Sequence, residues 1–184
     1  QALKVLAVPS TRVRGRLLRE GRVQAQLRHP NVASVIDVLE VDGNPSLLME
    51  YVNGPSLKLL LAKAELNIDQ IDDLARGILT GVAAAHSRGL VHRDIKPGNV
   101  LLSIEPQRLV AKITDFGLAK VLNEKQSGMQ TRTGIAMGTP AYMAPEQIRD
   151  SSRINACADV FSLGALLFRL ATGETAFVGK DTFE

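Results

Sequence analysis

The sequence predicts an α+β fold with a strand-rich first part and a helix-rich second part. Up to residue 52, short apolar segments of strand length alternate with turn residues. Beyond the Asn53-Gly54-Pro55 turn, apolar residues recur every three or four positions. The chain has 184 residues, 45% of them hydrophobic, which is enough to bury one good core or two small ones. We therefore expect two parts, residues 1–52 and residues 53–184.

The first part should open with a strand followed by a helix. Residues 3–8 show a short apolar strand pattern that Pro9 ends, and residues 11–28 then follow with mostly helical spacing. Gly15 and Gly21 each weaken this helix by about 1 kcal/mol relative to Ala. The position of the helix should therefore depend on its packing.

The remaining elements are a hairpin and two long helices. Residues 32–41 and 46–52 predict two strands joined by the turn Asp42-Gly43-Asn44-Pro45. Residues 68–85 have the apolar spacing of a long amphipathic helix. The apolar run at residues 154–171 is shorter than the roughly 20 residues that cross a bilayer, so we expect it to be a buried helix.

Composition and charge indicate the cellular setting of the chain and argue against a nucleic-acid or membrane surface. Cys157 is the only cysteine, so no intrachain disulfide can form, and residues 1–10 do not resemble a signal peptide. Both observations favour a reducing, cytoplasmic setting. The net charge is +3, but residues 1–30 hold seven basic residues and one acidic residue, a local charge of +6. No aromatic residues interleave with these arginines, which favours a solvated helix face over a nucleic-acid or membrane surface.

Three short motifs carry the chemistry. They are His92-Arg93-Asp94-Ile95-Lys96-Pro97-Gly98-Asn99, Asp115-Phe116-Gly117 and Ala144-Pro145-Glu146. In this order they resemble the catalytic loop, metal loop and activation segment of protein kinases. The resemblance covers essentially the whole chain. It implies a two-lobe protein-kinase-like fold, with a partial amino-terminal lobe at residues 1–52 and a partial carboxyl-terminal lobe at residues 53–184.

The resemblance implies transfer of the γ-phosphoryl group of ATP to Ser or Thr hydroxyls of a protein substrate. Asp94 would accept the hydroxyl proton, and Lys96 would stabilise the transferring phosphate. Asn99 and Asp115 would hold Mg²⁺, which prefers hard oxygen ligands of this kind. By family pattern, Lys96 and Thr139 favour Ser or Thr over Tyr as the acceptor.

The nucleotide site is implied in the same way. Lys4, on the strand at residues 2–6, would grip the α- and β-phosphates and pair with Glu20 on the next helix. Residues 49–52 resemble the hinge between lobes, where backbone groups would bond the adenine. The residues expected to line the nucleotide pocket are Ala2, Lys4, Met49, Glu50, Val52 and Leu101.

The activation segment at residues 115–146 is expected to carry regulation. Ser127, Thr131 and Thr133 are its hydroxyl residues in a polar stretch, and we predict phosphorylation at Thr131 or Thr133. Arg93 would be the charge partner of the phosphate, and a dimer would allow the modification in trans. The family pattern further implies that Asp159 caps the catalytic-loop backbone and that His92 and Phe116 are packing residues.

The chain also departs from the family pattern. The resemblance implies that the strands bearing the Gly-rich phosphate loop, normally just before Lys4, are missing, as are the last helices beyond Glu184. Glu146 would then be a buried carboxylate without its arginine partner, and its region would be loose.

The alternative function is a nucleotide-free, pseudokinase-like binding or scaffold module. Nucleic-acid binding through the arginine-rich helix is a third hypothesis, which predicts a steep salt dependence. The protein substrate, the upstream signal and membrane anchoring of a longer parent chain stay open.

Overall fold

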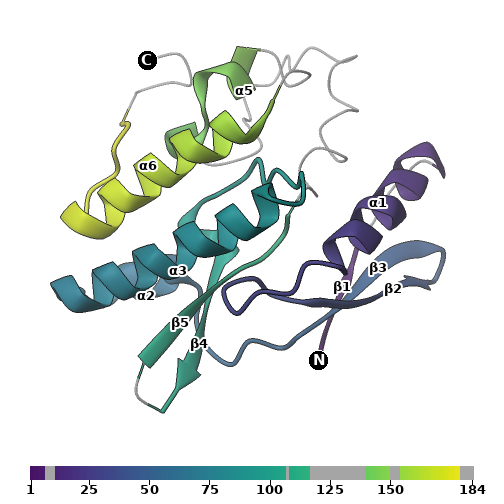
Figure 1. Cartoon of the computed structure of the whole chain (residues 1–184), viewed down its shortest axis with the longest axis horizontal. Helices are drawn as coiled ribbons and strands as arrows, with labels where there is room; N and C mark the ends of the chain where they lie inside the picture. Colours follow the sequence, from purple (N-terminus) through teal and green to yellow (C-terminus); the bar gives the residue numbers. More distant parts are fainter. Residues whose placement is uncertain (7–10, 107, 117–139, 150–153, 179–184) are drawn as a thin grey trace.

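The strand-rich part is a three-stranded antiparallel sheet covered by one helix. The structure is a computed structural model that describes residues 1–6, 11–106, 108–116, 140–149 and 154–178. β1 (Ala2–Val5), β3 (Asn44–Met49) and β2 (Val35–Val41) lie in that order across the sheet. α1 (Thr11–Gln24) packs on β2 and β3, at the right of Figure 1. The predicted order of strand, helix and hairpin is confirmed.

The hairpin turn differs in its bounds from the sequence expectation. Asp42 and Gly43 have φ angles of 49° and 76°, so they form a two-residue turn with both residues in the left-handed region. This turn suits the right-handed twist of the flanking strands. Asn44 and Pro45 therefore already belong to β3, which ends at Met49. The predicted turn was two residues too long because strand pairing takes in Asn44 and Pro45.

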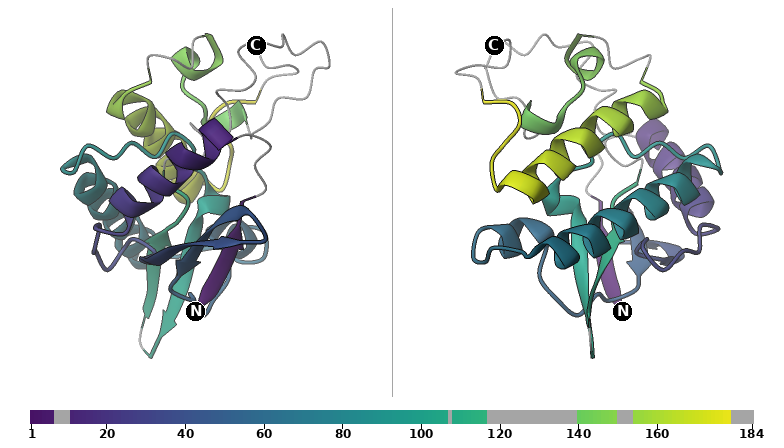
Figure 2. Two further views of the ribbon diagram at one scale, coloured as in Figure 1. Left: turned by 90° about the vertical axis from the view of Figure 1, so that its right-hand side faces the viewer. Right: turned by 60° about the vertical axis from the view of Figure 1, so that its left-hand side comes forward.

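In the described residues, the helix-rich part has four α-helices and a second, two-stranded sheet. The helices are α2 (Leu57–Leu61), α3 (Ile68–His86), α5 (Pro145–Arg149) and α6 (Ala156–Thr172). α3 lies between the hairpin of β4 (Val100–Glu105) and β5 (Arg108–Ile113) and the helix α6, as Figure 2 shows. None of the described helices is long and apolar enough to span a membrane.

Local sequence signals explain where the two long helices begin and end. Asn67 and Gln70 form a reciprocal capping box at the start of α3, which satisfies two backbone N–H groups. Gly173 ends α6 with a φ of 72°, a conformation that glycine adopts without steric cost. α6 is less buried than we expected, because Val160 and Phe168 on it are 61% and 45% exposed.

Two apolar clusters form the core. The larger cluster lies in the helix-rich part and includes Ile78 of α3, Ile113 of β5 and Leu166 of α6. The smaller cluster lies under α1 and includes Leu17 and Leu47. Two clusters of this kind match the two small cores that the chain length allowed.

The segment that connects the two parts is held by backbone hydrogen bonds. Leu102 N donates to Pro55 O at 2.9 Å, and Ile104 N donates to Asn53 O at 3.2 Å. Gly54 lies so close to β4 that a Cβ atom added there would stand 1.9 Å from Leu102 O. Backbone rather than a flexible side chain blocks that position, so only glycine fits.

We expect the Gly54→Ala substitution to lower the free energy of unfolding by about 2 kcal/mol, the usual range for overpacking. Urea unfolding followed by circular dichroism measures this change. Gly15→Ala is the matched control, since a Cβ at Gly15 on α1 meets nothing within 4 Å. That control should be neutral or stabilising. Equal effects of the two substitutions would contradict the close approach at Gly54.

Candidate active site

The β4–β5 hairpin brings two distant motifs together. Asn99 ends the short 3₁₀ turn Pro97–Asn99 directly before β4, and Thr114 and Asp115 follow β5 directly. The hairpin pairs Val100 with Ile113, and Thr114 N donates to Asn99 O at 3.0 Å. Because both motifs leave the same end of one hairpin, their polar side chains meet at one edge of the helix-rich part.

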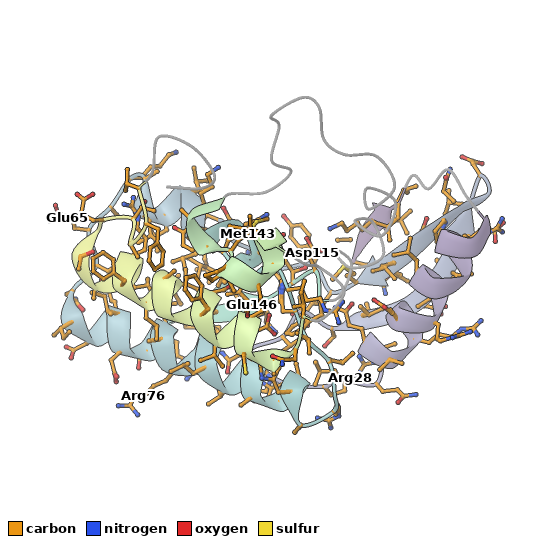
Figure 3. All side chains as sticks on the ribbon, turned by 90° about the horizontal axis from the view of Figure 1, so that it is seen from above. Arg28, Glu65, Arg76, Asp115, Met143 and Glu146 are labelled. Carbon is orange, nitrogen blue, oxygen red and sulfur yellow. The ribbon has the colours of Figure 1, made fainter. Side chains whose placement is uncertain are left out.

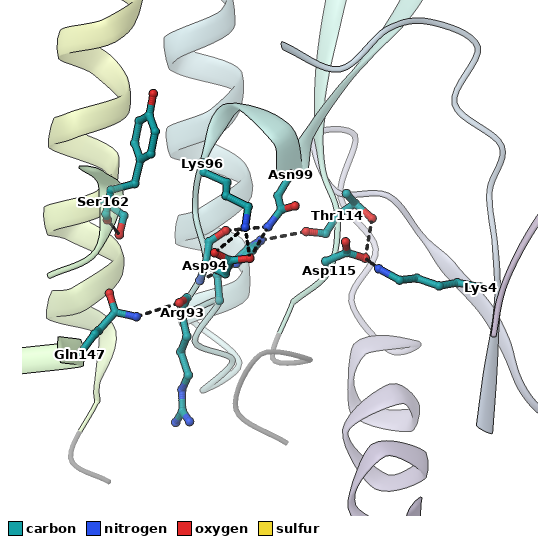
Figure 4. Close-up of polar contacts among 11 residues, drawn as sticks. Lys4, Arg93, Asp94, Lys96, Asn99, Thr114, Asp115, Gln147 and Ser162 are labelled. Carbon is teal, nitrogen blue, oxygen red and sulfur yellow. Dashed lines mark hydrogen bonds and ion pairs between the residues drawn. The ribbon is translucent and has the colours of Figure 1, made fainter. Parts of the chain in front are cut away.

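Asp94 is the centre of a small polar cluster on this edge, shown in Figure 4. Its Oδ2 lies 2.8 Å from Lys96 Nζ and accepts a hydrogen bond from Asn99 Nδ2 at 2.9 Å. Asn99 Nδ2 also donates to the Asp94 carbonyl at 2.7 Å, which fixes its amide orientation. The Asp94 side chain is 27% exposed. A carboxylate held by two donors and still open to solvent can accept a proton from an incoming hydroxyl.

Lys4 reaches this site from the other sheet. Its Nζ lies 2.6 Å from Asp115 Oδ1, and Thr114 Oγ1 donates to the same oxygen at 3.4 Å. Figure 3 places Asp115 between the strand-rich and helix-rich parts. Asp115 has a φ of 69°, in the left-handed region. The Lys4–Asp115 ion pair spans the space between the two sheets.

Lys4 contacts a carboxylate that the resemblance did not point to. Lys4 forms an ion pair with Asp115 in this structure. The expected pairing of Lys4 with Glu20 stays a prediction. Asp115 is close to Lys4 because it directly follows β5. Burial lowers the pKa of Arg93, and the negative charges of Glu20 and Asp159 partly offset that effect.

The catalytic-loop backbone is anchored by a buried carboxylate, as expected. Asp159 of α6 is fully buried and accepts hydrogen bonds from His92 N at 2.8 Å and from Arg93 N at 2.7 Å. Arg93 has a φ of 68°, which costs energy for a residue with a side chain. Asp159 also bonds His86 Nε2 at 2.7 Å, a contact that the sequence did not reveal. The anchor thus holds a strained turn directly before Asp94.

His92 supports the site by packing and by a defined tautomer. Asp94 N donates to His92 Nδ1 at 3.2 Å, so Nε2 carries the proton and donates to Thr114 O at 2.8 Å. The imidazole and Phe116 rings lie 4.6 Å apart between centroids, and both residues are buried. The predicted packing roles of His92 and Phe116 are confirmed. Burial lowers the pKa of His92 below its ordinary value of 6.5 and keeps the ring neutral.

We expect the free energy of unfolding to fall as the pH is lowered below about 6.5. Below this pH the unfolded chain binds a proton at His92 while the folded chain does not, so acid favours unfolding. Above this pH both states hold a neutral His92, and its contribution to stability is fully present. Urea titrations between about pH 7.5 and pH 5.5 measure the slope. The His92→Phe variant should lose most of this slope, and His29→Asn should keep it. An unchanged slope in His92→Phe would show that His92 does not titrate on unfolding.

The residues expected in the nucleotide pocket gather around one cluster. Ala2 pairs with Met49 across β1 and β3, and Leu101 packs against the same cluster as Met49 and Val52. Met49 and Val52 are buried, whereas Ala2 is exposed. The structure thus brings the residues expected around an adenine ring to one place.

Glu50 has a structural contact that the sequence did not indicate. Its Oε1 lies 2.7 Å from Lys112 Nζ on β5, and its Oε2 accepts from Ser34 N at 3.0 Å. Partial burial by itself would raise the pKa of Glu50. The hydrogen bonds from Lys112 and Ser34 and the charge of Lys112 outweigh this effect, so the pKa lies below its ordinary value of 4.5. The side chain therefore links the hinge segment to the helix-rich part.

The activation segment is described only in part. Gly117, Ser127, Thr131, Thr133 and Thr139 lie outside the described residues. Glu146 is exposed, so the predicted buried and unpaired carboxylate is wrong, and the expected desolvation cost does not arise. A contact missed by the sequence joins α5 to the catalytic loop, since Gln147 Nε2 donates to Arg93 O at 2.8 Å.

The family model described as protein kinase domain matches residues 1–184. The chain belongs to the protein kinase domain family. It is 38% identical over 167 residues to the probable serine/threonine-protein kinase PknB of Lactococcus lactis subsp. lactis (strain IL1403), covering 90% of this chain and 26% of that protein. It is 36% identical over 184 residues to the serine/threonine-protein kinase pkn3 of Myxococcus xanthus, covering 95% of this chain and 33% of that protein.

Solved structures support the same kinase fold. The crystal structure of Rad53 residues 1–466 in complex with AMP-PNP matches with a TM-score of 0.75 and 30% sequence identity. The match covers 97% of this chain and 42% of that one. The expected two-lobe protein-kinase-like fold is thereby confirmed. This kinase-family chain spans only 26% and 33% of the two bacterial relatives, so the activity of a whole protein is a matter for proposal.

Proposed function

We propose that this chain is part of a serine/threonine protein kinase in which Asp94 accepts the proton of the acceptor hydroxyl. The observation that carries this proposal is the Asp94 carboxylate, held by Lys96 at 2.8 Å and by Asn99 at 2.9 Å yet partly exposed. Phosphoryl transfer needs such a group to orient the nucleophile and a nearby cation to offset charge on the phosphate. Asp94 and Lys96 supply both functions within one loop.

Asn99 and Asp115 are the residues that would hold Mg²⁺. Among the described residues, no group of three or more His, Cys, Asp or Glu side chains is placed to hold a metal ion. Mg²⁺ is commonly bound through one or two protein carboxylates together with substrate phosphates and water. Because Asn99 donates through Nδ2 to Asp94, its carbonyl oxygen is the atom left for a cation. When bound, the metal would neutralise charge on the phosphates of ATP.

Lys4 and the hinge would bind the nucleotide. The 2.6 Å contact with Asp115 supports a phosphate role for Lys4, because it shows that the ammonium reaches the carboxylate proposed for the metal. Glu20, one helix away, is proposed to orient Lys4 when phosphates are bound. Adenine would lie between Ala2 and Leu101, beside Met49 and the backbone of Glu50 and Val52.

The proposal also covers how the kinase would be regulated, what it would bind and where it would act. We retain phosphorylation at Thr131 or Thr133 with Arg93 as the charge partner, a protein substrate, and a dimer for modification in trans. A cytoplasmic setting is proposed from the single Cys157, which is exposed as a free thiol. The scaffold alternative is less favoured, since both bacterial relatives above are named as kinases.

Transfer of the labelled γ-phosphoryl group from ATP to a Ser/Thr-rich acceptor protein tests the function. We expect incorporation on Ser and Thr that requires Mg²⁺ and stops when a chelator removes it. The assay is best paired with calorimetry of ATP binding, with and without Mg²⁺. A folded chain that neither binds ATP nor transfers phosphate would contradict the proposal and favour the scaffold alternative.

A further inference from the structure

The peptide that joins Arg93 to Asp94 is held from both sides. Its N–H group, which belongs to Asp94, donates to His92 Nδ1 at 3.2 Å. Its carbonyl oxygen, which belongs to Arg93, accepts from Gln147 Nε2 at 2.8 Å. Figure 4 shows the Gln147 side chain reaching across to the backbone of Arg93. Because this peptide directly precedes the Cα atom of Asp94, its orientation sets the direction in which the Asp94 carboxylate leaves the loop.

Gln147 uses both ends of its side-chain amide. Its Oε1 accepts from Ala144 N, the backbone group directly before α5, at 3.0 Å, while its Nε2 donates to Arg93 O. Only the oxygen can accept from an N–H group and only the nitrogen can donate to a carbonyl, so the two partners fix the orientation of the amide. A carboxylate at this position could make the first contact but not the second.

The segment that carries Gln147 is itself firmly placed. Tyr142 and Ala144 are 9% and 0% exposed, and Tyr142 belongs to the larger apolar cluster. Tyr142 O accepts from Ser162 Oγ of α6 at 2.6 Å. These contacts fix the start of α5 against the core of the helix-rich part. Gln147 therefore holds the Arg93 carbonyl from a rigid base.

Gln70 shows what a capping glutamine does by itself. It is the third residue of α3, as Gln147 is the third residue of α5, and its Oε1 accepts from Asn67 N at 3.0 Å. Gln70 is exposed, whereas Gln147 is half-buried and directs its amide nitrogen to the catalytic loop. The capping contact uses only the oxygen. The nitrogen of Gln147 thus has a role beyond the helix that carries it.

We propose that Gln147 is a positioning residue for Asp94. Its amide nitrogen holds the Arg93 carbonyl, and this keeps the Asp94 carboxylate directed at the acceptor hydroxyl. α5 and the catalytic loop are thereby joined into one unit. The inference rests on the proposed function, in which Asp94 accepts the proton. A small displacement of a catalytic group lowers the rate of the chemical step, so the effect of losing this contact belongs to kcat.

Two substitutions separate this role from capping. Gln147→Glu keeps an oxygen for Ala144 N but, because glutamate is ionised at about pH 8, offers no hydrogen to Arg93 O. Gln147→Met keeps the length of the side chain and removes both contacts. We expect kcat for phosphoryl transfer to fall at least about fivefold in both variants, with the KM for ATP unchanged. Gln70→Glu is the matched control and should keep the native kcat, because it makes the same change in a capping glutamine outside the catalytic loop.

Hydrogen exchange gives a second readout that needs no ATP. The amides of Arg93 and Asp94 donate to Asp159 and His92, so they report on the order of the turn before the catalytic carboxylate. We expect both Gln147 variants to exchange these two amides at least about threefold faster, relative to the amides of β4 and β5. Gln70→Glu should leave their exchange unchanged.

Three results would overturn the proposal. A native kcat in Gln147→Glu would reduce Gln147 to a helix cap. A loss of rate confined to Gln147→Glu would be an effect of the new charge. Unchanged exchange at Arg93 and Asp94 in both variants would show that Gln147 does not hold the turn. If the native chain transfers no phosphate, the proposed function fails, and the exchange experiment alone decides whether Gln147 orders the loop.

Discussion

Asp94→Asn will lower the rate of phosphoryl transfer by a factor of about 10² to 10⁴, the usual contribution of a positioned general base. The substitution keeps the shape of the side chain, so an oxygen can still accept from Lys96 or Asn99. The amide cannot accept a proton from a hydroxyl at neutral pH. We expect kcat to carry the loss and the KM for ATP to change little, because Asp94 does not belong to the proposed nucleotide pocket.

Steady-state kinetics with labelled ATP measure this effect. Asp42→Asn is a suitable control, since Asp42 lies in the left-handed turn between β2 and β3, where asparagine is equally accommodated. This control should keep the native rate and the native stability. A native rate in Asp94→Asn would mean that another group accepts the proton.

The sequence predicted that Asp94, Lys96, Asn99 and Asp115 lie close together, because they are near one another along the chain or on one hairpin. Asp94, Lys96 and Asn99 share one loop, so their contacts follow from local geometry. Asp115 joins them because β4 and β5 pair directly between the two motifs. Periodicity also placed the long helices α3 and α6, since their apolar spacing is regular and they begin at asparagine caps.

The contacts that the sequence missed all depend on tertiary packing. The ion pair of Lys4 with Asp115 joins residues separated by 111 positions, and no local pattern marks it. The bond of His86 to Asp159 and the pair of Lys112 with Glu50 likewise join separate elements. Gln24 is polar, so its burial could not be predicted from residue type. Exposure of Glu146 was also missed, because the family pattern implies burial.

Asp159→Ala will lower the free energy of unfolding by about 3 to 5 kcal/mol, the range found when one partner of a buried charged group is removed. The carboxylate is fully buried and accepts from His92 N, Arg93 N and His86 Nε2. Its loss leaves three donors without their acceptor and removes the anchor of the strained turn at Arg93. Urea unfolding gives the stability change, and Glu174→Ala, at an exposed carboxylate after α6, should have no effect.

The same substitution should also reduce catalysis in the molecules that stay folded. Asp94 directly follows the anchored turn, and its own N–H donates to His92 Nδ1. When the turn relaxes, the Asp94 carboxylate moves relative to Lys96 and Asn99. Asp159→Asn helps to separate the effect on stability from the effect on rate. In the native protein one carboxylate oxygen accepts from Arg93 N, and the other accepts from His92 N and His86 Nε2. The asparagine has one carbonyl oxygen, so it can replace only one of these two oxygens. We therefore expect Asp159→Asn to be intermediate in both stability and rate. Activity lost in full at native stability would instead place Asp159 in the chemical step itself.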